Sequence, residues 1–320
     1  MKILITGSMG FISRNLIEKQ MLDDTNISEI YGIDRIDSEI KSNKYHHYKI
    51  DLSNTHLENI PEKLFDVDLL IHTAGIPSPQ YYKVEPFKTI FLNYDLTKSL
   101  LEKIYNKTTF IYFSSSEIYG DPDSLNIPTK ENYYGHVSSI GDRSCYDESK
   151  RLGETISYLF KNNKNKKVKI IRPFNFYGDY MRQNDNRIIP KFINQAMNNE
   201  DITIFSHGKQ TRAYCNIDDA VVMIKKICLE GKNFVYNVGK MDEELTAIEL
   251  AQKVLLNVPN SKSKLIQIDY PDNYPKNEPM RRCPNIDKYY KEFKQKPSIG
   301  IDEGLINFYQ YAKKKLVIEY

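Results

Sequence analysis

Short hydrophobic runs alternate with segments of helical spacing over the first half of the chain. The runs predict strands at 2–5, 29–34, 68–72, 109–113 and 168–171, with one more that ends at Asp51-Leu52. Apolar residues recur at helical spacing over 85–105 and 146–160. Strands that alternate with helices are typical of an α/β fold, in which a parallel sheet is wound on both faces and binds ligands at the carboxyl ends of its strands.

The charge balance of the 320 residues narrows the possible partners. Lys and Arg total 45 and Asp and Glu total 42, which gives a net charge of +3, and 40% of the residues are hydrophobic. So small and scattered an excess does not predict a nucleic-acid surface. No run reaches the roughly 20 apolar residues of a membrane span. The densest basic run, 161–167, is predicted to be a solvated loop.

The cysteines and histidines do not form a metal-binding pattern. The four cysteines lie far apart and lack a Cys-x-x-Cys spacing, which is typical of reduced thiols in a cytosol. His46, His47 and His56 have no acid or cysteine at ligand spacing on a shared face. Met1 runs almost directly into a strand and a glycine turn, which is unlike a signal peptide. We therefore expect a cytoplasmic protein without a metal site.

A glycine-rich turn follows the first predicted strand and opens a helix. Gly7 and Gly10 would let the backbone approach a pyrophosphate, whose charge would lie at the helix N-terminus formed by Phe11 and Ile12. This order of strand, turn and helix predicts a Rossmann domain that binds a dinucleotide. Ser13 stands where the motif has its third glycine, so the contact between helix and strand must accept a hydroxymethyl group.

Polar and small residues at the next strand ends fit the same ligand. Asp34 follows the glycines by about twenty residues, where a carboxylate binds the ribose hydroxyls of NAD and repels a 2′-phosphate. Arg35 is the feature that would suit NADP, but we favour NAD. Asp51 and Leu52 are candidates for the adenine contact, although Asp51 also suits an ordinary turn. Thr73-Ala74 would let the cofactor pass over the end of the fourth strand.

A second group of polar residues predicts redox chemistry at a hydroxyl group. Tyr146 and Lys150 lie at i and i+4, on one face of a helix, and Ser115 follows the fifth strand. A lysine cation beside a phenol lowers the pKa of the phenol, so that Tyr146 becomes a base near neutral pH. Ser115 would hydrogen-bond the same substrate hydroxyl. Tyr146 and Lys150 would also contact the cofactor.

Together these segments resemble the extended short-chain dehydrogenase/reductase family, which contains the NAD-dependent nucleotide-sugar epimerases, dehydratases and decarboxylases. The resemblance covers nearly the whole chain and is strongest to the UDP-glucuronate decarboxylase group. It rests on six segments: 115–120 (SSEIYG), 141–151 (GDRSCYDESKR), 172–178 (RPFNFYG), 184–189 (NDNRII), 208–212 (GKQTR) and 279–284 (PMRRCP). It implies a Rossmann domain at 1–172, completed by about 211–240, and a smaller substrate-binding domain at 173–210 and 241–320.

The resemblance also implies a role for each site residue. Ser115, Tyr146 and Lys150 would act on the C4 hydroxyl of the sugar, whereas Ser116 and Glu117 would face C5 and C6. Arg212 would approach the C6 carboxylate or the diphosphate. Oxidation of C4 makes C6 a β-keto carboxylate, so carbon dioxide can leave and yield UDP-xylose or a UDP-4-keto-pentose.

A further set is implied for substrate binding, namely Asn175, Arg187, Gln210, Arg212 and Arg282. With Arg182, the three arginines of that set would converge on one diphosphate. The helices 85–105 and 146–160 would pair across a two-fold axis and form a homodimer.

The residue type at position 116 differs between some of the related enzymes and so helps to distinguish their reactions. Glucose-type 4,6-dehydratases carry Asp where this chain has Ser116, but mannose-type enzymes also have Ser followed by Glu. Glu117 also suits a structural carboxylate paired with a nearby arginine. Asp142 and Asp179 depart from the decarboxylase pattern. A 4,6-dehydratase or a 4-epimerase of another nucleotide sugar therefore stays open, as does a non-catalytic dinucleotide-binding sensor or scaffold.

Overall fold

Seven parallel strands form the largest sheet in the part of the chain that the structure, a computed structural model, describes: residues 1–182, 185–271 and 279–318. In spatial order the strands are β10 (Val235–Val238), β6 (Lys167–Pro173), β5 (Thr109–Phe113), β4 (Leu69–His72), β1 (Lys2–Thr6), β2 (Glu29–Asp34) and β3 (Tyr45–Lys49). Sequential strands run outward in both directions from the neighbours β1 and β4, so the predicted doubly wound α/β fold is confirmed.

The described chain divides into two units. The first contains this sheet and comprises residues 1–120, 134–173 and 221–238. The second comprises residues 121–133, 174–220 and 239–320. The substrate-binding role expected for 173–210 and 241–320 stays a prediction.

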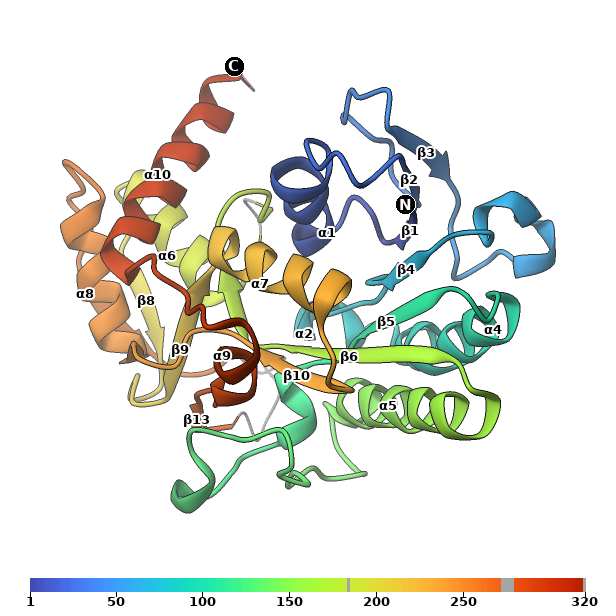
Figure 1. Cartoon of the computed structure of the whole chain (residues 1–320). Coiled ribbons are helices and arrows are strands. Elements are labelled where there is room, and N and C mark those ends of the chain that lie inside the picture. The colour runs from blue at the N-terminus through green and yellow to red at the C-terminus, as the bar shows by residue number, and fades with distance from the viewer. Residues whose placement is uncertain (183–184, 272–278, 319–320) are drawn as a thin grey trace. The chain divides into compact units, whose positions relative to one another are not determined.

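The strands of the first unit are buried on both faces, which explains their continuous apolar sequences. Ile3, Leu4 and Ile5 of β1 are fully buried, as is every residue of β4. Figure 1 shows α5 (Ser144–Lys164) and α7 (Ile217–Glu230) on opposite sides of β6 and β10. The other helices of this unit are α1 (Phe11–Leu16), α2 (Pro79–Tyr82), α3 (Pro86–Ile90) and α4 (Leu96–Lys103).

Helical segments other than α-helices extend several of these elements. The π-helical turns η1 (Ile17–Met21) and η4 (Phe91–Asp95) continue α1 and α3, so the helix predicted over 85–105 is nearly continuous. The short 3₁₀ segments are η2 (Leu57–Asn59), η3 (Glu62–Leu64), η5 (Ser116–Tyr119) and η6 (Ser124–Asn126), the last of these in the second unit.

Two predicted boundaries are wrong. The run 161–167 is not a loop, because α5 continues to Lys164 and β6 begins at Lys167. Asn165 ends the helix with a φ of 53°, a left-handed conformation that asparagine tolerates, so the chain needs only two residues to turn. The strand expected to reach Asp51-Leu52 ends at Lys49, which pairs with Asp34, the last residue of β2. β3 is an edge strand, and among the described residues it pairs only with β2, so the ladder ends with β2.

The second unit contains smaller sheets. β9 (Thr211–Asn216) pairs with β7 (Asn175–Tyr177), β11 (Glu244–Thr246) and β13 (Arg281–Arg282), while β8 (Ile202–Phe205) pairs with β12 (Leu265–Ile268). Its helices are α6 (Ile188–Met197), α8 (Ala247–Asn257), α9 (Asp287–Phe293) and α10 (Ile301–Ile318).

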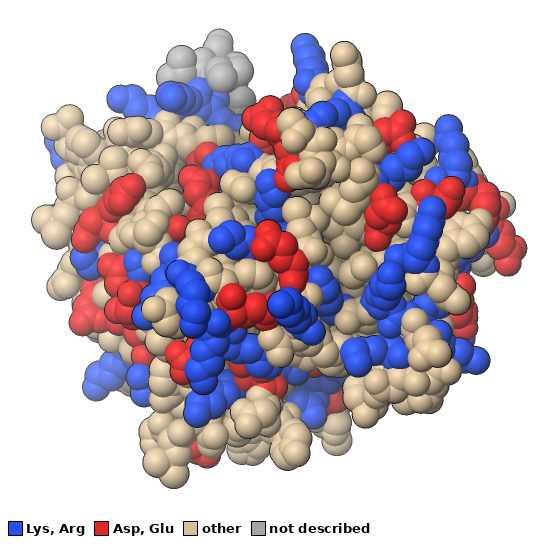
Figure 2. Space-filling model, viewed as in Figure 1, with Lys and Arg blue, Asp and Glu red and all other residues tan. Residues whose placement is uncertain are grey.

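The surface carries both signs of charge. On the face drawn in Figure 2, basic and acidic side chains are intermixed. Across the described residues, no helix combines the length and the apolar character needed to cross a membrane.

Candidate active site

The glycine-rich turn between β1 and α1 passes very close to the end of β4. Gly7 has a φ of +72°, and a Cβ there would lie 2.8 Å from the backbone nitrogen of Ala74. The Gly7 and Ser8 N–H groups donate to the carbonyl of Ile33, at 2.8 and 3.2 Å, which holds the turn against β2. Only glycine fits such a turn, and the same lack of a side chain admits a ligand close to the backbone.

Ser13 replaces the third motif glycine by forming a hydrogen bond. Its Oγ lies 2.5 Å from Oγ1 of Thr73, which in turn donates to the carbonyl of Thr6 at 2.7 Å. Ser13 is 1% exposed, so the hydroxymethyl group packs inside the contact between helix and strand. The departure from the motif therefore leaves the turn intact.

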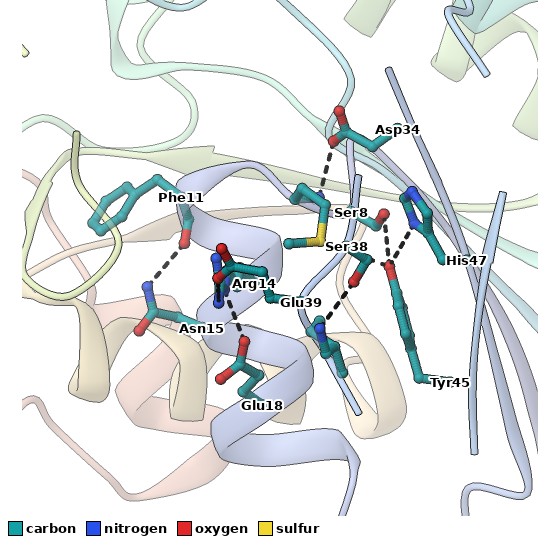
Figure 3. Close-up of polar contacts among 12 residues, drawn as sticks. Ser8, Phe11, Arg14, Asn15, Glu18, Asp34, Ser38, Glu39, Tyr45 and His47 are labelled. Carbon is teal, nitrogen blue, oxygen red and sulfur yellow. Dashed lines mark hydrogen bonds and ion pairs between the residues drawn. The ribbon is translucent and has the colours of Figure 1, made fainter. Parts of the chain in front are cut away.

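Asp34 lies at the carboxyl end of β2, beside the turn (Figure 3). Its Oδ2 accepts from the Met9 N–H at 2.9 Å and its Oδ1 from the Ile36 N–H at 3.3 Å. Arg14 donates to Glu18 and Glu39, both at 2.8 Å, and Arg35 is exposed. The carboxylate is thus fixed next to the glycine turn, where a ribose-binding acid is needed.

Asp51 and Leu52 differ in surroundings. Leu52 is 5% exposed and packs in the core. Oδ1 of Asp51 accepts from the backbone N–H of Ser53 at 2.9 Å and from its hydroxyl at 2.6 Å. Burial acts to raise the pKa of Asp51, but these hydrogen bonds outweigh it and lower the pKa. The expected adenine contact stays a prediction.

The structure brings together Ser115, Tyr146 and Lys150. Ser115 caps η5, where its Oγ accepts from the Glu117 N–H at 3.2 Å, and its side chain also hydrogen-bonds Tyr146. The Lys150 ammonium donates to the carbonyl of Phe113 at 2.8 Å and lies 5.8 Å from the ring centroid of Tyr146. The end of β5 and the first two turns of α5 therefore supply the whole set.

The expected lowering of the Tyr146 pKa is wrong for this structure. Burial raises the pKa of Tyr146 above its usual value, and the hydrogen bond from Ser115 offsets only part of the rise. Burial also lowers the pKa of Lys150 to about 7. Both groups are removed from water, and desolvation of the charged form is the largest cause of each shift.

Ser116 and Glu117 occupy the first turn of η5. Ser116 is 5% exposed. Arg143 forms an ion pair with Glu117 and lies 3.6 Å from Oδ2 of Asp147. The pairing of Glu117 with an arginine, left open by the sequence, is present.

Two residues of this site were missed by the sequence analysis. The ring of Tyr82 stacks on that of Tyr146, with centroids 5.2 Å apart. Nδ2 of Asn93 donates to Oγ of Ser149 at 2.9 Å, while its Oδ1 is buried without a hydrogen-bond partner among the described residues. In a chain with 24 tyrosines nothing marks Tyr82, whereas a lone asparagine inside an apolar helical pattern was a usable signal.

The candidate sugar-diphosphate residues lie in the second unit. Arg212 is 6% exposed and donates to the carbonyls of Thr211, Pro279 and Met280 at 2.7–3.2 Å. Its strand neighbour in register is Arg282, which is 7% exposed. The structure therefore places two of the four candidate arginines side by side.

The other candidates of that unit are more dispersed. Arg187 precedes α6 and forms an ion pair with Asp185, with Nη2 and Oδ2 2.5 Å apart. Asn175 donates to the carbonyl of Ala213 at 3.4 Å, and Gln210 donates to Tyr270 Oη at 2.9 Å. Arg182 is exposed. Asn184, the first residue of the segment 184–189, lies outside the described residues.

The first unit fits a nicotinamide dinucleotide on its own geometry. The Gly7 turn is too tight for a side chain, Asp34 is fixed beside it, and Gly75 lies near the Lys150 ammonium, 3.8 Å from a Cβ built at Gly75. The unpartnered Oδ1 of Asn93 lies near the same glycine, 3.4 Å from that Cβ. The first unit therefore combines a turn that suits phosphate, an acid that suits ribose, and polar side chains near Gly75 that suit the nicotinamide end.

Known proteins match this chain over most of its length. A family model described as the NAD dependent epimerase/dehydratase family matches residues 3–239. UDP-glucuronic acid decarboxylase 1 of Danio rerio is 33% identical over 98% of this chain and 73% of its own length. UDP-glucuronic acid decarboxylase 6 of Arabidopsis thaliana is 34% identical over 95% of this chain and 87% of its own length.

A solved structure agrees with these matches. The UDP-glucuronic acid 4-epimerase of Bacillus cereus, in complex with UDP-glucuronic acid and NAD, is 25% identical with a TM-score of 0.81. The match covers 98% of this chain and 100% of that one. The resemblance carried by the sequence motifs is confirmed.

Proposed function

This chain belongs to the NAD dependent epimerase/dehydratase family, and from that premise we propose that it decarboxylates UDP-glucuronate to UDP-xylose or a UDP-4-keto-pentose. The observation that carries the proposal is the similarity to UDP-glucuronic acid decarboxylases of animals and plants over at least 95% of the chain. The Ser115, Tyr146 and Lys150 side chains support an active enzyme rather than a sensor, because a binding protein needs no hydroxyl base.

NAD is the cofactor, and the first unit supplies its binding residues. The backbone of Gly7, Gly10, Phe11 and Ile12 would hold the pyrophosphate, and Asp34 would accept the ribose hydroxyls. Asp51 and Leu52 would line the adenine, while Thr73 and Ala74 border the path over β4. When bound, NAD supplies the acceptor of the C4 hydrogen and a positive ring charge that favours the phenolate of Tyr146.

Tyr146 would take the proton from the C4 hydroxyl and later return it. The Ser115 hydroxyl stabilises the phenolate and hydrogen-bonds the same oxygen of the sugar. Lys150, held by the carbonyl of Phe113, would fix the nicotinamide ribose and exchange protons near neutral pH, since its pKa is about 7. Placement and electrostatics are thus the contribution of the protein.

The remaining candidates would face the rest of the substrate. Ser116 and Glu117 would lie toward C5 and C6, and Ser116 is a poor acid for the departing hydroxyl of a dehydratase. Arg212 would bind the C6 carboxylate or the diphosphate, since an arginine fork suits either anion. Asn175, Arg187, Gln210 and Arg282 would complete the nucleotide-diphosphate site.

Exposed apolar side chains support the proposed homodimer. Phe87 of α3 is 85% exposed, and Leu152, Tyr158 and Leu159 of α5 are 42–53% exposed. α3 and α5 pack together, and the exposed apolar side chains of the two helices would form the contact with a second copy. Phe87→Glu is expected to convert the dimer to a monomer in light scattering; an unchanged mass would count against this interface.

The four free cysteines favour the cytoplasm as the location of the protein.

The deciding experiment is a mass measurement on a panel of nucleotide sugars. Purified protein is incubated with UDP-glucuronate and with neutral UDP-, GDP-, CDP- and dTDP-hexoses. Loss of about 44 mass units from UDP-glucuronate, the mass of carbon dioxide, supports the proposal. Loss of about 18 units from a hexose would replace it with dehydration, and an unchanged mass with altered chromatographic retention would replace it with epimerisation.

A further inference from the structure

One arginine lies between two carboxylates at the start of α5. Arg143 forms an ion pair with Glu117 of η5, and its Nε lies 3.6 Å from Oδ2 of Asp147, one helical turn further on. The three side chains are only 9–15% exposed. Little water competes for the donors of a guanidinium this buried, so the two acids that flank it help to orient it.

The backbone of Arg143 is fixed as firmly as its side chain. Arg143 is the residue that precedes α5, and its carbonyl accepts the N–H groups of Tyr146 and Asp147, both at 3.0 Å. The first turn of α5 therefore fixes the backbone from which the Arg143 side chain extends. Asp147 helps to fix the position of the guanidinium at its other end.

Hydrogen bonds connect the Arg143–Glu117 ion pair to the catalytic residues Ser115 and Tyr146. Oγ of Ser115 accepts from the Glu117 N–H and also hydrogen-bonds Tyr146. The charges of Glu117, Asp147 and Arg143 all act on the Tyr146 phenol. Ser115 thus holds the backbone of Glu117, and Arg143 holds its carboxylate.

We propose that Arg143 is a positioning residue that holds the Glu117 carboxylate in one orientation for the step at C5 and C6, after C4 has been oxidised. The inference rests on the proposed function. In that step the C5–C6 bond breaks, its electron pair moves into the C4 carbonyl to form an enolate, and carbon dioxide leaves. C5 then takes one proton from solvent.

An ionised Glu117 suits this redistribution of charge. Negative charge leaves the C6 carboxylate, on the side of Glu117, and moves to the C4 oxygen, on the side of Ser115 and Tyr146. Coulomb repulsion by Glu117 favours that direction, and it acts strongly in a site with little water. If the Glu117 carboxylate rotated away, this repulsion would be lost. Arg143 matters because it prevents that rotation.

Arginine is suited to this task in a way that lysine is not. Its planar fork can donate to Glu117 through Nη2 while Nε faces Asp147, whereas an ammonium on a flexible stem fixes neither direction. Arg143→Lys therefore keeps the charge and loses the orientation.

The test separates the two chemical steps. Absorbance of the reduced nicotinamide at 340 nm reports C4 oxidation, and mass spectrometry reports loss of carbon dioxide. In Arg143→Lys and Arg143→Ala the first signal is expected to persist and to accumulate, while the second slows about 100-fold, as a misplaced group commonly does. Guanidinium at about 50 mM, well below denaturing concentrations, is expected to restore part of the second step in Arg143→Ala.

A double-mutant cycle identifies the residue through which Arg143 acts. Glu117→Gln should slow the second step, and adding Arg143→Lys to it should cost nothing further. Independent, additive losses would contradict the proposal. So would a variant in which both steps decline together with cofactor binding, since that pattern indicates a structural role.

The matched control is a second buried Arg–Glu pair, which joins β6 to α5. Arg172 donates to Glu154 at 2.8 and 2.6 Å, and the two side chains are 9% and 13% exposed. Arg172→Lys is expected to lower the melting temperature without separating the two steps. If the wild-type enzyme instead dehydrates another nucleotide sugar, the proposed function is wrong, and the same comparison with that sugar still tests Arg143.

Discussion

The ring of Tyr82 stacks on the ring of Tyr146, with centroids 5.2 Å apart and planes 15° from parallel. Tyr82 is 1% exposed, and its hydroxyl is buried without a hydrogen-bond partner among the described residues. A face that is covered in this way leaves the Tyr146 phenol only small rotations. The apolar cover also accounts for part of the burial that raises the pKa of Tyr146.

Removal of the Tyr82 ring should therefore affect both stability and catalysis. Tyr82→Ala is expected to lower the free energy of unfolding by about 3 kcal/mol, as for other buried aromatic residues. The value of kcat should also fall, because the Tyr146 ring is released. Tyr82→Phe keeps the stack and is expected to be neutral in urea unfolding and steady-state kinetics. A raised KM in Tyr82→Phe would show instead that the hydroxyl contacts substrate.

Tyr146→Phe tests the hydroxyl base directly. The variant keeps the ring and the stack with Tyr82, so calorimetry should show that it still binds NAD. Turnover of the nucleotide sugar should be lost, since the proton of the C4 hydroxyl has no acceptor. Unchanged turnover would exclude Tyr146 as the base and would reopen the sensor hypothesis.

Much of this fold could be predicted from the periodicity of apolar residues in the sequence, but part of the site could not. The strands at 29–34 and 109–113 were predicted residue for residue, because strands buried on both faces consist of unbroken apolar runs. The end of β3 was missed because a ladder stops with its partner strand, which is a tertiary effect. The stacking of Tyr82 and the burial of Lys150 likewise depend on segments distant in sequence.

The lowered pKa of Lys150 predicts a dependence of stability on pH. The unfolded chain binds the lysine proton more tightly than the folded chain, so this group costs stability at pH 7 and less as pH rises toward its unfolded pKa. Between pH 7 and 9 the stability of the wild type relative to Lys150→Met should rise by about 2 kcal/mol. Urea unfolding of both proteins measures the difference. Lys164→Met, at an exposed position of the same helix, is the control and should follow the wild type.

His72 gives a second dependence on pH, in the acid range. Its ring is buried with Nδ1 2.7 Å from Oγ1 of Thr6, and burial lowers its pKa to about 3. Below about pH 6.5 the unfolded chain gains a proton that the folded chain excludes, so stability falls as pH falls. From pH 7.5 to 5 the advantage of the wild type over His72→Asn should shrink by about 2 kcal/mol in urea unfolding.

The exposed histidine of β3 provides the control for that measurement. His46→Asn should show the same acid dependence as the wild type. An advantage of the wild type over His72→Asn that stays constant with pH would mean that the folded protein accepts a proton on His72.

Gly7→Ala should weaken cofactor binding more than it weakens the fold. The new Cβ would lie 2.8 Å from the Ala74 nitrogen at a φ of +72°, so the turn must shift. We expect NAD affinity in calorimetry to fall about 100-fold, as for a displaced binding group. Gly300→Ala, where the added Cβ would lie 3.8 Å from Oε1 of Glu243, should bind NAD as the wild type does. Equal affinity of Gly7→Ala and wild type would place the pyrophosphate elsewhere.

The place of β10 at the outer edge of β6 has a consequence for biosynthesis. Residues 235–238 complete the first sheet, yet they leave the ribosome only after 174–220 of the other unit have been made. Until then β6 is an unpaired edge strand of the nascent chain, and its backbone donors and acceptors can pair with a strand of another chain. Truncated messages that stop before codon 235 should consequently yield a chaperone-dependent, aggregation-prone product, even though the glycine turn and the catalytic helix have already been translated.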